Sequence, residues 1–286
     1  MTRDTGNYLD SLNENGWFSK EGFFSADELN VFEEAVLALL VQQAKKIGEY
    51  RERVIEIEST DSSNFEKFQI IYEIMEADDK EALYQVQKLL TSSVDARSVF
   101  NPEFIDLMAG ILESDTKSML IDGPALFVNR PKTERLLYKW HSEQHYYPKR
   151  RRFLNVWIPL FEDKSQMNGT MSFKEKSHLR DFPFADYQGF NKDSIDKSNY
   201  FIQYEIPQNF LDEYKEHFCI AAPGDLYVFH KNLAHRSNAN TSNKYSVAIV
   251  ARVWDPSDDL TLSGNMHVTP YGGNTGRPNL IVNPRF

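Results

Sequence analysis

The stretch "PGDLYVFHKNLAHRSNANTSNKYSVAIVARVW", Pro223 to Trp254, decides the fold class. It opens with a Pro-Gly-Asp turn, which the apolar run Leu226–Phe229 follows directly. A second run, "KYSVAIVARVW", is rich in β-branched residues and begins after a connection of Ser, Asn and Thr. Both runs are typical of β-strands. Because no long helical pattern separates them, we expect antiparallel rather than parallel pairing.

Three segments further upstream have the same character. They are short, rich in β-branched and aromatic residues, and bounded by Gly, Pro, Asn or Asp: "SMLIDGPALFVN", "RFLNVWIPLF" and "GTMSF". The second half is therefore expected to form an antiparallel sandwich or barrel. A polar stretch at about 177–216 interrupts the pattern and is expected to be an insertion with a short helix near Gln208–Lys215.

The first half is expected to be mainly helical. Ser25 and Glu28 form an S-x-x-E capping box, and apolar residues then recur at helical spacing. Asn101 followed by Pro102 provides an N-cap and a proline at the first helical position. The expected helices run from about Ala26 to Lys46, near Phe65–Met75, near Lys80–Leu90, and from Pro102 to about Ser114.

Composition restricts the class of protein. The chain has 286 residues, of which 41% are hydrophobic and 13% aromatic, enough for a substantial core. Its formal net charge of -10 repels nucleic acids and anionic membranes, so we expect neither as a partner. The single cysteine, Cys219, excludes an intrachain disulfide and a cysteine zinc cluster. Without an apolar leader or a membrane-spanning run, a cytoplasmic protein is expected. The oligomeric state stays open.

The stretch "YKWHSEQHYYPKRRRF" contains the candidate metal ligands. If His141 and Glu143 lie at the end of a strand, their side chains project to the same side. One imidazole and one carboxylate are two ligands of the 2-His-1-carboxylate triad, which binds Fe(II) and keeps open coordination positions. The third ligand should be a distant histidine, and His230 and His235 are the candidates.

Other residues of this stretch allow two interpretations. His145 follows His141 at helical spacing, but Tyr146-Tyr147-Pro148 disfavours a helix, so we expect His145 to face the substrate or the surface rather than bind metal. The basic run Lys149–Arg152 is either a solvated loop or an anion contact at the mouth of a pocket.

Four ordered stretches resemble the phytanoyl-CoA dioxygenase-like family of Fe(II)/2-oxoglutarate oxygenases. They are "LNENGWFSKEGFFSADELNVFEEAV", "YKWHSEQHYYP", "LNVWIPLFEDKSQMNGTMSFKEKSHL" and "PGDLYVFHKNLAHRSNANTS". The resemblance implies an α+β fold with a mainly β core, a double-stranded β-helix (jelly roll, cupin-like), and an N-terminal helical region packed on it. It implies a single oxygenase domain over 1–286, with a helical part at about 1–115, a core at about 116–260 and a C-terminal extension at about 261–286.

The resemblance also implies the chemistry. Iron would be bound by His141, Glu143 and His235, although the family more often has aspartate at the position of Glu143. The implied dioxygenase hydroxylates a small organic molecule with Fe(II), 2-oxoglutarate and O2, releases succinate and CO2, and can use ascorbate as a supporting reductant. Candidate substrates are an acyl thioester, a sugar acid or a natural-product intermediate, and an anionic substrate is one option. Two alternatives stay open: a non-catalytic jelly-roll ligand-binding module and a cupin-type metal-dependent isomerase.

Further site residues follow from the same resemblance. The family binds the distal carboxylate of 2-oxoglutarate with an arginine at the start of the last core strand, where this chain has Lys244 and Ser246. Arg252 lies further along the same strand and is the alternative anchor. The remaining expected cofactor contacts are Ser237, Asn155 and Trp157, and the expected substrate contacts are Tyr146, Tyr147, His145, Arg150 and Arg152.

Overall fold

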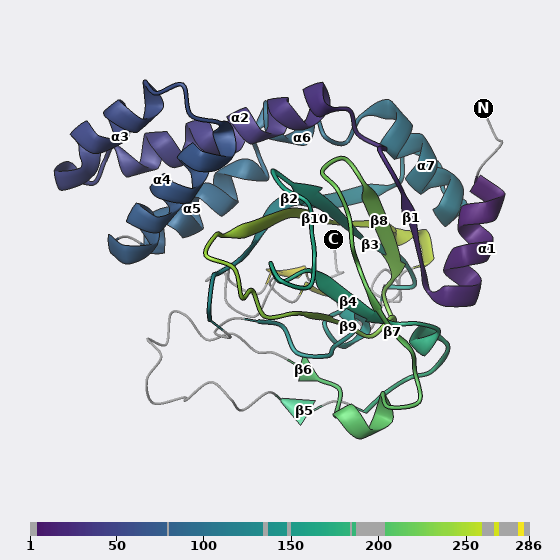
Figure 1. Cartoon of the computed structure of the whole chain (residues 1–286). Helices are drawn as coiled ribbons and strands as arrows, with labels where there is room; N and C mark the ends of the chain where they lie inside the picture. The colour runs from purple at the N-terminus through teal and green to yellow at the C-terminus, as the bar shows by residue number, and fades with distance from the viewer. Residues whose placement is uncertain are drawn as a thin grey trace.

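The computed structural model describes residues 5–78, 80–133, 137–147, 150–183, 185–186, 204–258, 266–268 and 280–282. Helices from the first half lie along one side of a mainly β core formed by the second half (Figure 1). All pairs within the core sheets are antiparallel, so the expected fold class is confirmed. Among the described helices, none has the length and apolar character of a membrane span.

The helical layer follows the sequence signals closely. Ser25 and Glu28 form the predicted capping box: the Ser25 hydroxyl accepts from the Glu28 N–H at 3.3 Å, and the Glu28 carboxylate accepts from the Ser25 N–H at 2.9 Å. The four expected helices correspond to α2, α4, α5 and α7, whereas α1, α3 and α6 were not expected. The helices are α1 (Thr5–Asn15), α2 (Ala26–Ala44), α3 (Arg51–Glu58), α4 (Asn64–Asp78), α5 (Lys80–Leu90), α6 (Val94–Arg97) and α7 (Pro102–Leu112).

Two antiparallel sheets form the core. The larger has the order β1-β8-β3-β10-β2 and the smaller the order β7-β4-β9. The larger comprises β1 (Trp17–Lys20), β8 (Leu226–His230), β3 (Arg152–Leu160), β10 (Ser246–Asp255) and β2 (Leu120–Asn129). The smaller comprises β7 (Glu216–Phe218), β4 (Met171–Lys174) and β9 (His235–Ser237).

Alternate residues of the larger sheet face different layers, as the period of a strand requires. Val156 and Ile158 of β3 pack with the helices in the main hydrophobic core. Trp157 points to the other side and packs with Phe173 of the smaller sheet. Both faces of β3 are therefore covered, which explains why it is buried along nearly its whole length. The candidate site lies between the two sheets.

The expected insertion differs in detail from the structure. The predicted helix near Gln208–Lys215 is a single 3-10 turn, Gln208–Phe210. Beside it lies a short pair, β5 (Ala185–Asp186) with β6 (Tyr204–Glu205). Residues 184 and 187–203 of the insertion lie outside the described residues.

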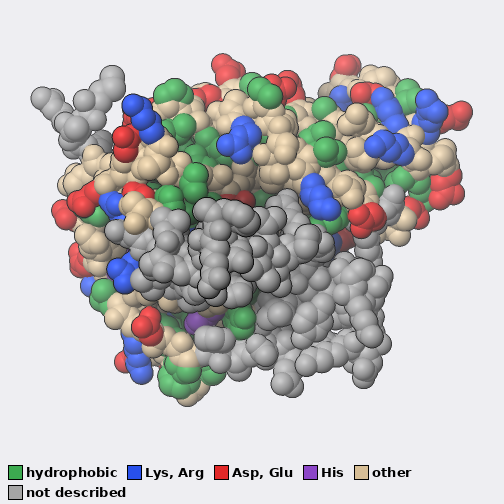
Figure 2. All heavy atoms as spheres, turned by 180° about the vertical axis from the view of Figure 1, so that it is seen from behind, with side chains coloured by type: hydrophobic (Ala, Val, Ile, Leu, Met, Phe, Trp, Pro, Cys, Tyr) green, Lys and Arg blue, Asp and Glu red, His purple; other side chains and the backbone are tan. Residues whose placement is uncertain are grey.

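The expected C-terminal extension, about 261–286, falls mostly outside the described residues. Within it the structure describes the pair β11 (Met266–Val268) and β12 (Leu280–Val282). On the molecular face in Figure 2, basic and acidic side chains are interspersed over the helical layer. The expectation that nucleic acid is not a partner stays a prediction.

Candidate active site

Two histidines from distant parts of the chain meet in one backbone bridge. The His141 N–H donates to the His235 carbonyl at 3.0 Å, and the His235 N–H donates to the His141 carbonyl at 2.9 Å. The two imidazole ring centroids are 4.1 Å apart. We expected a strand end at His141, but the structure has a single bridge followed by the 3-10 turn Glu143–His145. Because Ser142 is still extended, Glu143 projects to the same side as His141.

The predicted triad is assembled in the structure. One ligand atom from each of His141, Glu143 and His235 lies within 4.8 Å of the other two. The three residues are 4%, 5% and 6% exposed, respectively. Two imidazole nitrogens and one carboxylate oxygen, converging in a buried place, are the donor set of the 2-His-1-carboxylate site.

Both imidazoles are oriented for ligation by their own backbone surroundings. The Nδ1 atom of His141 lies 2.7 Å from the Lys139 carbonyl, and that of His235 lies 2.9 Å from the Leu233 carbonyl. Each Nδ1–H must donate to its carbonyl, so the Nε2 lone pair is left for a metal. Burial and the neighbouring His235 lower the pKa of His141 to about 3, and burial also lowers the pKa of His235. Both rings are therefore neutral, which is the ligating form.

Arg252 holds the carboxylate ligand. Its Nε and Nη2 atoms donate to the two oxygens of Glu143 at 3.2 and 3.1 Å. Burial alone would raise the pKa of Glu143, but the charge and hydrogen bonds of Arg252 lower it below its ordinary value. Glu143 is thus a buried carboxylate that stays ionised. This donor set fits Fe(II), since the ligands are deprotonated and each is held by a second contact.

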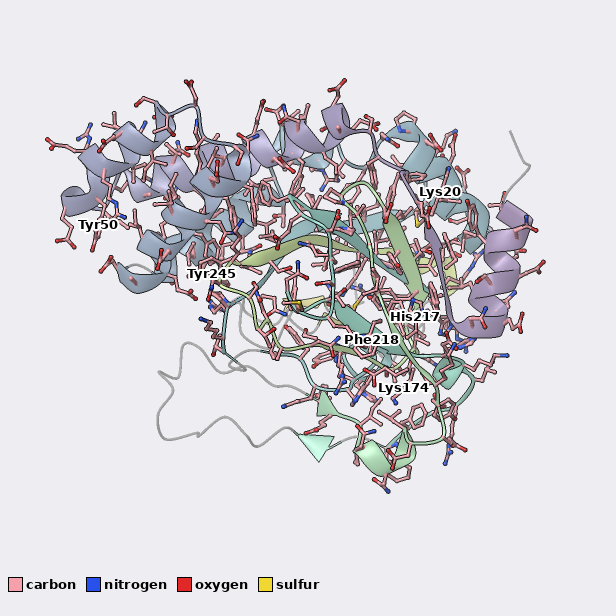
Figure 3. All side chains as sticks on the ribbon, viewed as in Figure 1. Lys20, Tyr50, Lys174, His217, Phe218 and Tyr245 are labelled. Atoms are coloured by element: carbon pink, nitrogen blue, oxygen red, sulfur yellow. The ribbon has the colours of Figure 1, made fainter. Side chains whose placement is uncertain are left out.

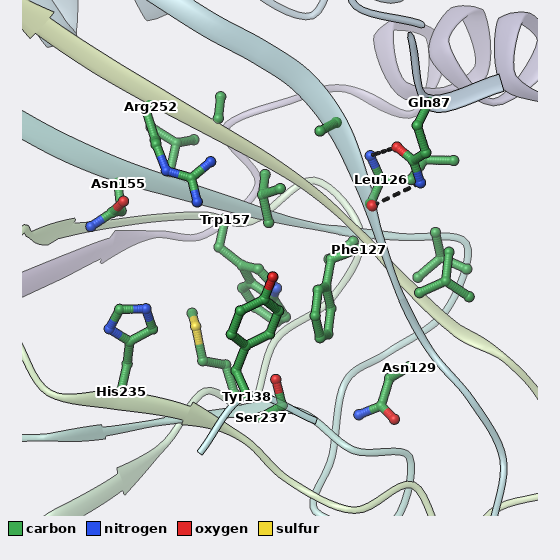
Figure 4. Close-up of a pocket in the computed structure, with 18 of the residues that line it drawn as sticks. Gln87, Leu126, Phe127, Asn129, Tyr138, Asn155, Trp157, His235, Ser237 and Arg252 are labelled. Carbon is green, nitrogen blue, oxygen red and sulfur yellow. Dashed lines mark hydrogen bonds between the residues drawn. The ribbon is translucent and has the colours of Figure 1, made fainter. Parts of the chain in front are cut away.

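A cavity of about 430 Å³ adjoins the triad (Figure 4). It lies between the sheets, passes the edge strand β2 and reaches α5. Its aromatic lining comprises Tyr72, Tyr84, Phe127, Tyr138, Tyr146, Tyr147, Trp157 and Phe229. Such a mainly aromatic cavity with a few polar groups suits a small organic ligand.

Most of the predicted pocket residues line this cavity. On the cofactor side these are Ser237, Ser246, Asn155, Trp157 and Arg252, and on the substrate side Tyr146 and Tyr147. The Nδ2 atom of Asn155 is buried and has no hydrogen-bond acceptor among the described residues. The Tyr146 hydroxyl accepts from the Tyr204 N–H at 3.2 Å. Their roles in ligand binding stay predictions.

Lys244, the expected anchor for 2-oxoglutarate, lies elsewhere. β10 begins at Ser246, so Lys244 precedes the strand and is exposed, with Nζ 5.3 Å from the ring centroid of Phe65. The neighbouring Tyr245 points to the helices, where its hydroxyl donates to Glu76 at 2.9 Å (Figure 3). At the start of β10 the cavity is lined by Ser246 and the apolar residues Val247 and Ala248, none of which carries a charge.

Two residues of the basic run, Arg150 and Arg152, were expected to contact substrate, but the structure gives them other partners. The guanidinium of Arg150 lies 3.9 Å from the ring centroid of Trp254 and 4.4 Å from that of Tyr147. Arg152 pairs with Asp255 at 2.9 Å and donates to backbone carbonyls at the end of α7. Neither side chain is among the described residues that line the cavity. Lys149 lies outside the described residues.

The other histidines lie outside the triad. His145 faces the Tyr204 ring edge-on at 6.1 Å and is not among the described lining residues. His230 accepts from the Asn232 N–H at 3.1 Å. His178 contacts the Asn13 carbonyl at 3.0 Å.

Sequence reasoning missed several polar residues of the cavity, among them Asn129 and Lys164. Asn129 ends β2, and its Nδ2 donates to the carbonyls of Gly169 and Asn238, both at 2.8 Å. Its Oδ1 atom is buried with no donor among the described residues. Lys164 lies in the connection between β3 and β4 and is 2% exposed. A lysine beside two acidic residues, as here, reads in sequence as a solvated loop, so no local pattern marks it.

The jelly-roll core and the buried His-Glu-His group define the class of non-haem metal oxygenases. The chain belongs to the phytanoyl-CoA dioxygenase (PhyH) family, whose model matches residues 12–247. A comparison with curated protein sequences gave no match.

Solved structures share the fold at low sequence identity. "EctD from S. alaskensis in its apoform" is 16% identical with a TM-score of 0.57, over 90% of this chain and 80% of that one. The "non-heme monooxygenase; ThoJ apo" is 18% identical with a TM-score of 0.56, over 87% and 78% of the two chains. The "non-heme alpha ketoglutarate dependent carbocyclase SnoK from nogalamycin biosynthesis" is 17% identical with a TM-score of 0.52, over 90% and 89%.

Proposed function

We propose that this protein is an Fe(II)- and 2-oxoglutarate-dependent dioxygenase that hydroxylates a small organic molecule in the aromatic cavity. One observation carries the proposal: His141, Glu143 and His235 converge beside the cavity, each fixed in its ligating form by a second contact. Family membership supports it. So do neighbours of the same fold, whose titles name iron and α-ketoglutarate complexes.

The triad residues would hold Fe(II). With 2-oxoglutarate and O2, the bound metal supplies oxidation of a C–H bond, with release of succinate and CO2. The chain contributes fixed geometry, because the Lys139 and Leu233 carbonyls orient the imidazoles. Arg252 keeps Glu143 ionised and in place. The aromatic walls would limit the access of water to the site, which would protect a strong oxidant from side reactions.

The substrate is proposed to be recognised mainly through aromatic surface. Tyr146 and Tyr147 follow the metal ligands directly and line the cavity. The basic run does not support an anionic substrate, since Arg150 lies over the rings of Trp254 and Tyr147 and Arg152 pairs with Asp255. Hydroxylation is the proposed outcome because Glu143 occupies the carboxylate position of the triad. Neighbours titled as an epimerase and a carbocyclase have the same fold, so product analysis must distinguish these outcomes.

The test has two parts. The purified protein is reconstituted with Fe(II) without oxygen, and succinate is then measured on addition of 2-oxoglutarate and O2 with a substrate panel. Separately, bound iron is measured for His235→Ala and Glu143→Ala, with His230→Gln as the matched control. We expect both ligand variants to lose iron and the control to retain it. Full iron occupancy in both ligand variants would refute the triad, and succinate formation independent of added Fe(II) would refute the reaction.

A further inference from the structure

The cavity needs a cation for the distal carboxylate of 2-oxoglutarate, if the proposed function is right. Arginine is absent from the start of β10, where Ser246 faces the cavity and Lys244 is exposed. The cavity is nevertheless lined by five described cations: Lys88, Arg130, Lys164, Arg236 and Arg252. Their surroundings decide which of them is available.

Four of these cations already have partners of their own. Arg130 is ion-paired with Glu76, and Arg236 with Glu216 at 2.8 Å. Lys88 lies over the Tyr84 ring, with Nζ 4.2 Å from the centroid. Arg252 donates to both oxygens of Glu143.

Lys164 differs from them. It is fully buried, and its Nζ has one acceptor among the described residues, the Leu160 carbonyl at 3.1 Å. An ammonium has three N–H donors, so two of them are left for a ligand. Glu162 and Asp163 attract its charge, but its Nζ donates to the Leu160 carbonyl and not to either of these carboxylates. A buried cation with unused donors, lining a cavity, is a site for an anion.

Lys164 lies beside the start of β10, although it is not part of that strand. Leu160, whose carbonyl accepts from Lys164, pairs with Val247, the residue after Ser246. Ser246 itself pairs with Asn129. Lys164 and Ser246 therefore lie at one end of the cavity, where the family uses arginine.

Ser237 completes this end. The Asn129 amide donates to the carbonyl of Asn238, the residue after Ser237, and Ser237 is two residues along β9 from His235. Two residues along a strand span about 6.6 Å, so Ser237 lies close to the triad residue His235. Figure 4 shows Asn129 and Ser237 away from Arg252 and Asn155, with His235 on the side of the latter pair.

Arg252 lies at the opposite end. It is the sixth residue after Ser246 on β10, about 20 Å along an extended strand. Its guanidinium contacts a metal ligand directly. The distal carboxylate of 2-oxoglutarate is separated by two methylene groups from the keto-acid end that chelates metal. A carboxylate at Arg252 would instead lie against Glu143.

We infer that Lys164, supported by Ser246, binds the distal carboxylate of 2-oxoglutarate in this chain. The cation then lies in the connection that follows β3 instead of on β10, and Ser246 leaves the space that an arginine would fill. Lys164 is thus a specificity-determining residue for the dicarboxylate co-substrate.

The test measures binding rather than turnover. Calorimetric titration of 2-oxoglutarate into anaerobic Fe(II)-loaded protein is compared for the wild type, Lys164→Met and the matched control Lys244→Met. Loss of a hydrogen bond to a charged group predicts a Kd about 10- to 100-fold higher for Lys164→Met, with bound iron unchanged. The control is expected to bind like the wild type.

A charge-relocation variant gives the second measurement. In Lys164→Met combined with Ser246→Arg, the cation returns to the strand start, and 2-oxoglutarate affinity is expected to recover. If Lys164→Met folds, retains iron and binds 2-oxoglutarate with wild-type Kd, the inference is overturned while the proposed function stands. If the iron-loaded wild type binds no 2-oxoglutarate, the proposed function itself fails. A rise in Kd for Lys244→Met alone would return the anchor role to that residue.

Discussion

Replacing Lys164 by methionine is expected to stabilise the fold while it weakens co-substrate binding. Burial lowers the pKa of Lys164 from 10.5 to about 8, against the attraction of Glu162 and Asp163. A lysine whose folded pKa lies below its unfolded pKa binds fewer protons in the folded state. The charged form therefore destabilises the fold below the folded pKa, and this penalty disappears as pH rises from about 8 through 10.5.

The expected change in the free energy of unfolding follows from the difference between the folded and unfolded pKa of Lys164. The fall from 10.5 to about 8 corresponds to a penalty of about 3 kcal/mol near neutral pH, at about 1.4 kcal/mol per pKa unit. Methionine removes the charge but loses the hydrogen bond to the Leu160 carbonyl, worth about 1 kcal/mol. That carbonyl keeps a second donor, the Glu162 N–H at 2.9 Å, so it is not left unpaired. The free energy of unfolding should rise by about 2 kcal/mol.

Urea unfolding at about pH 7 and about pH 10 checks the prediction. The advantage of Lys164→Met should shrink at the higher pH, where the wild-type lysine is largely neutral in the folded protein. Lys244→Met should match the wild type at both values, since that side chain is exposed. If Lys164 instead stabilises the fold, Lys164→Met should be less stable than the wild type. Either a loss of stability or a gain independent of pH would refute the reasoning.

Three further predictions concern other parts of the chain. Arg252→Met should lower iron affinity about 10- to 100-fold, because the main influence that opposes burial and lowers the pKa of Glu143 is then lost; unchanged iron binding would remove Arg252 from ligand positioning. Arg152→Met should lower the free energy of unfolding in urea by about 3 kcal/mol through loss of its pair with the buried Asp255, and a higher Kd for 2-oxoglutarate instead would assign it to the site. Ser25→Ala should lower the same free energy by about 1 kcal/mol, and no change would show that the α2 cap is not stabilising.

The convergence of the triad residues could be predicted because it depends on ordered stretches rather than on one local pattern. His141, Glu143 and His235 lie in two of the stretches that resemble the family, and the fold brings them together. The local reason given for their convergence was only partly right. His141 lies in a single bridge, not a strand, and the extended backbone of Ser142 preserves the alternation.

The proposed anchor, Lys164, could not be predicted from the last core strand. Lys244 was expected at the start of that strand, but β10 begins only at Ser246, so Lys244 lies before it. Arg152 shows the same limit for charge patterns. Its partners, Asp255 and the end of α7, are distant in sequence, so the run gave no sign that this arginine is structural.

Lys164 can take the place of an arginine on β10 because backbone contacts fix both the start of β10 and the connection after β3. The pairing of Val247 with Leu160 brings the end of β3 beside the start of β10. The connection after β3 is then held by the Lys164 N–H, which donates to the Ala221 carbonyl at 2.6 Å. A lysine placed there has a defined direction without belonging to a strand. The same contacts bury Lys164. Its buried charge therefore destabilises the protein without co-substrate, and the carboxylate of bound co-substrate would offset that penalty.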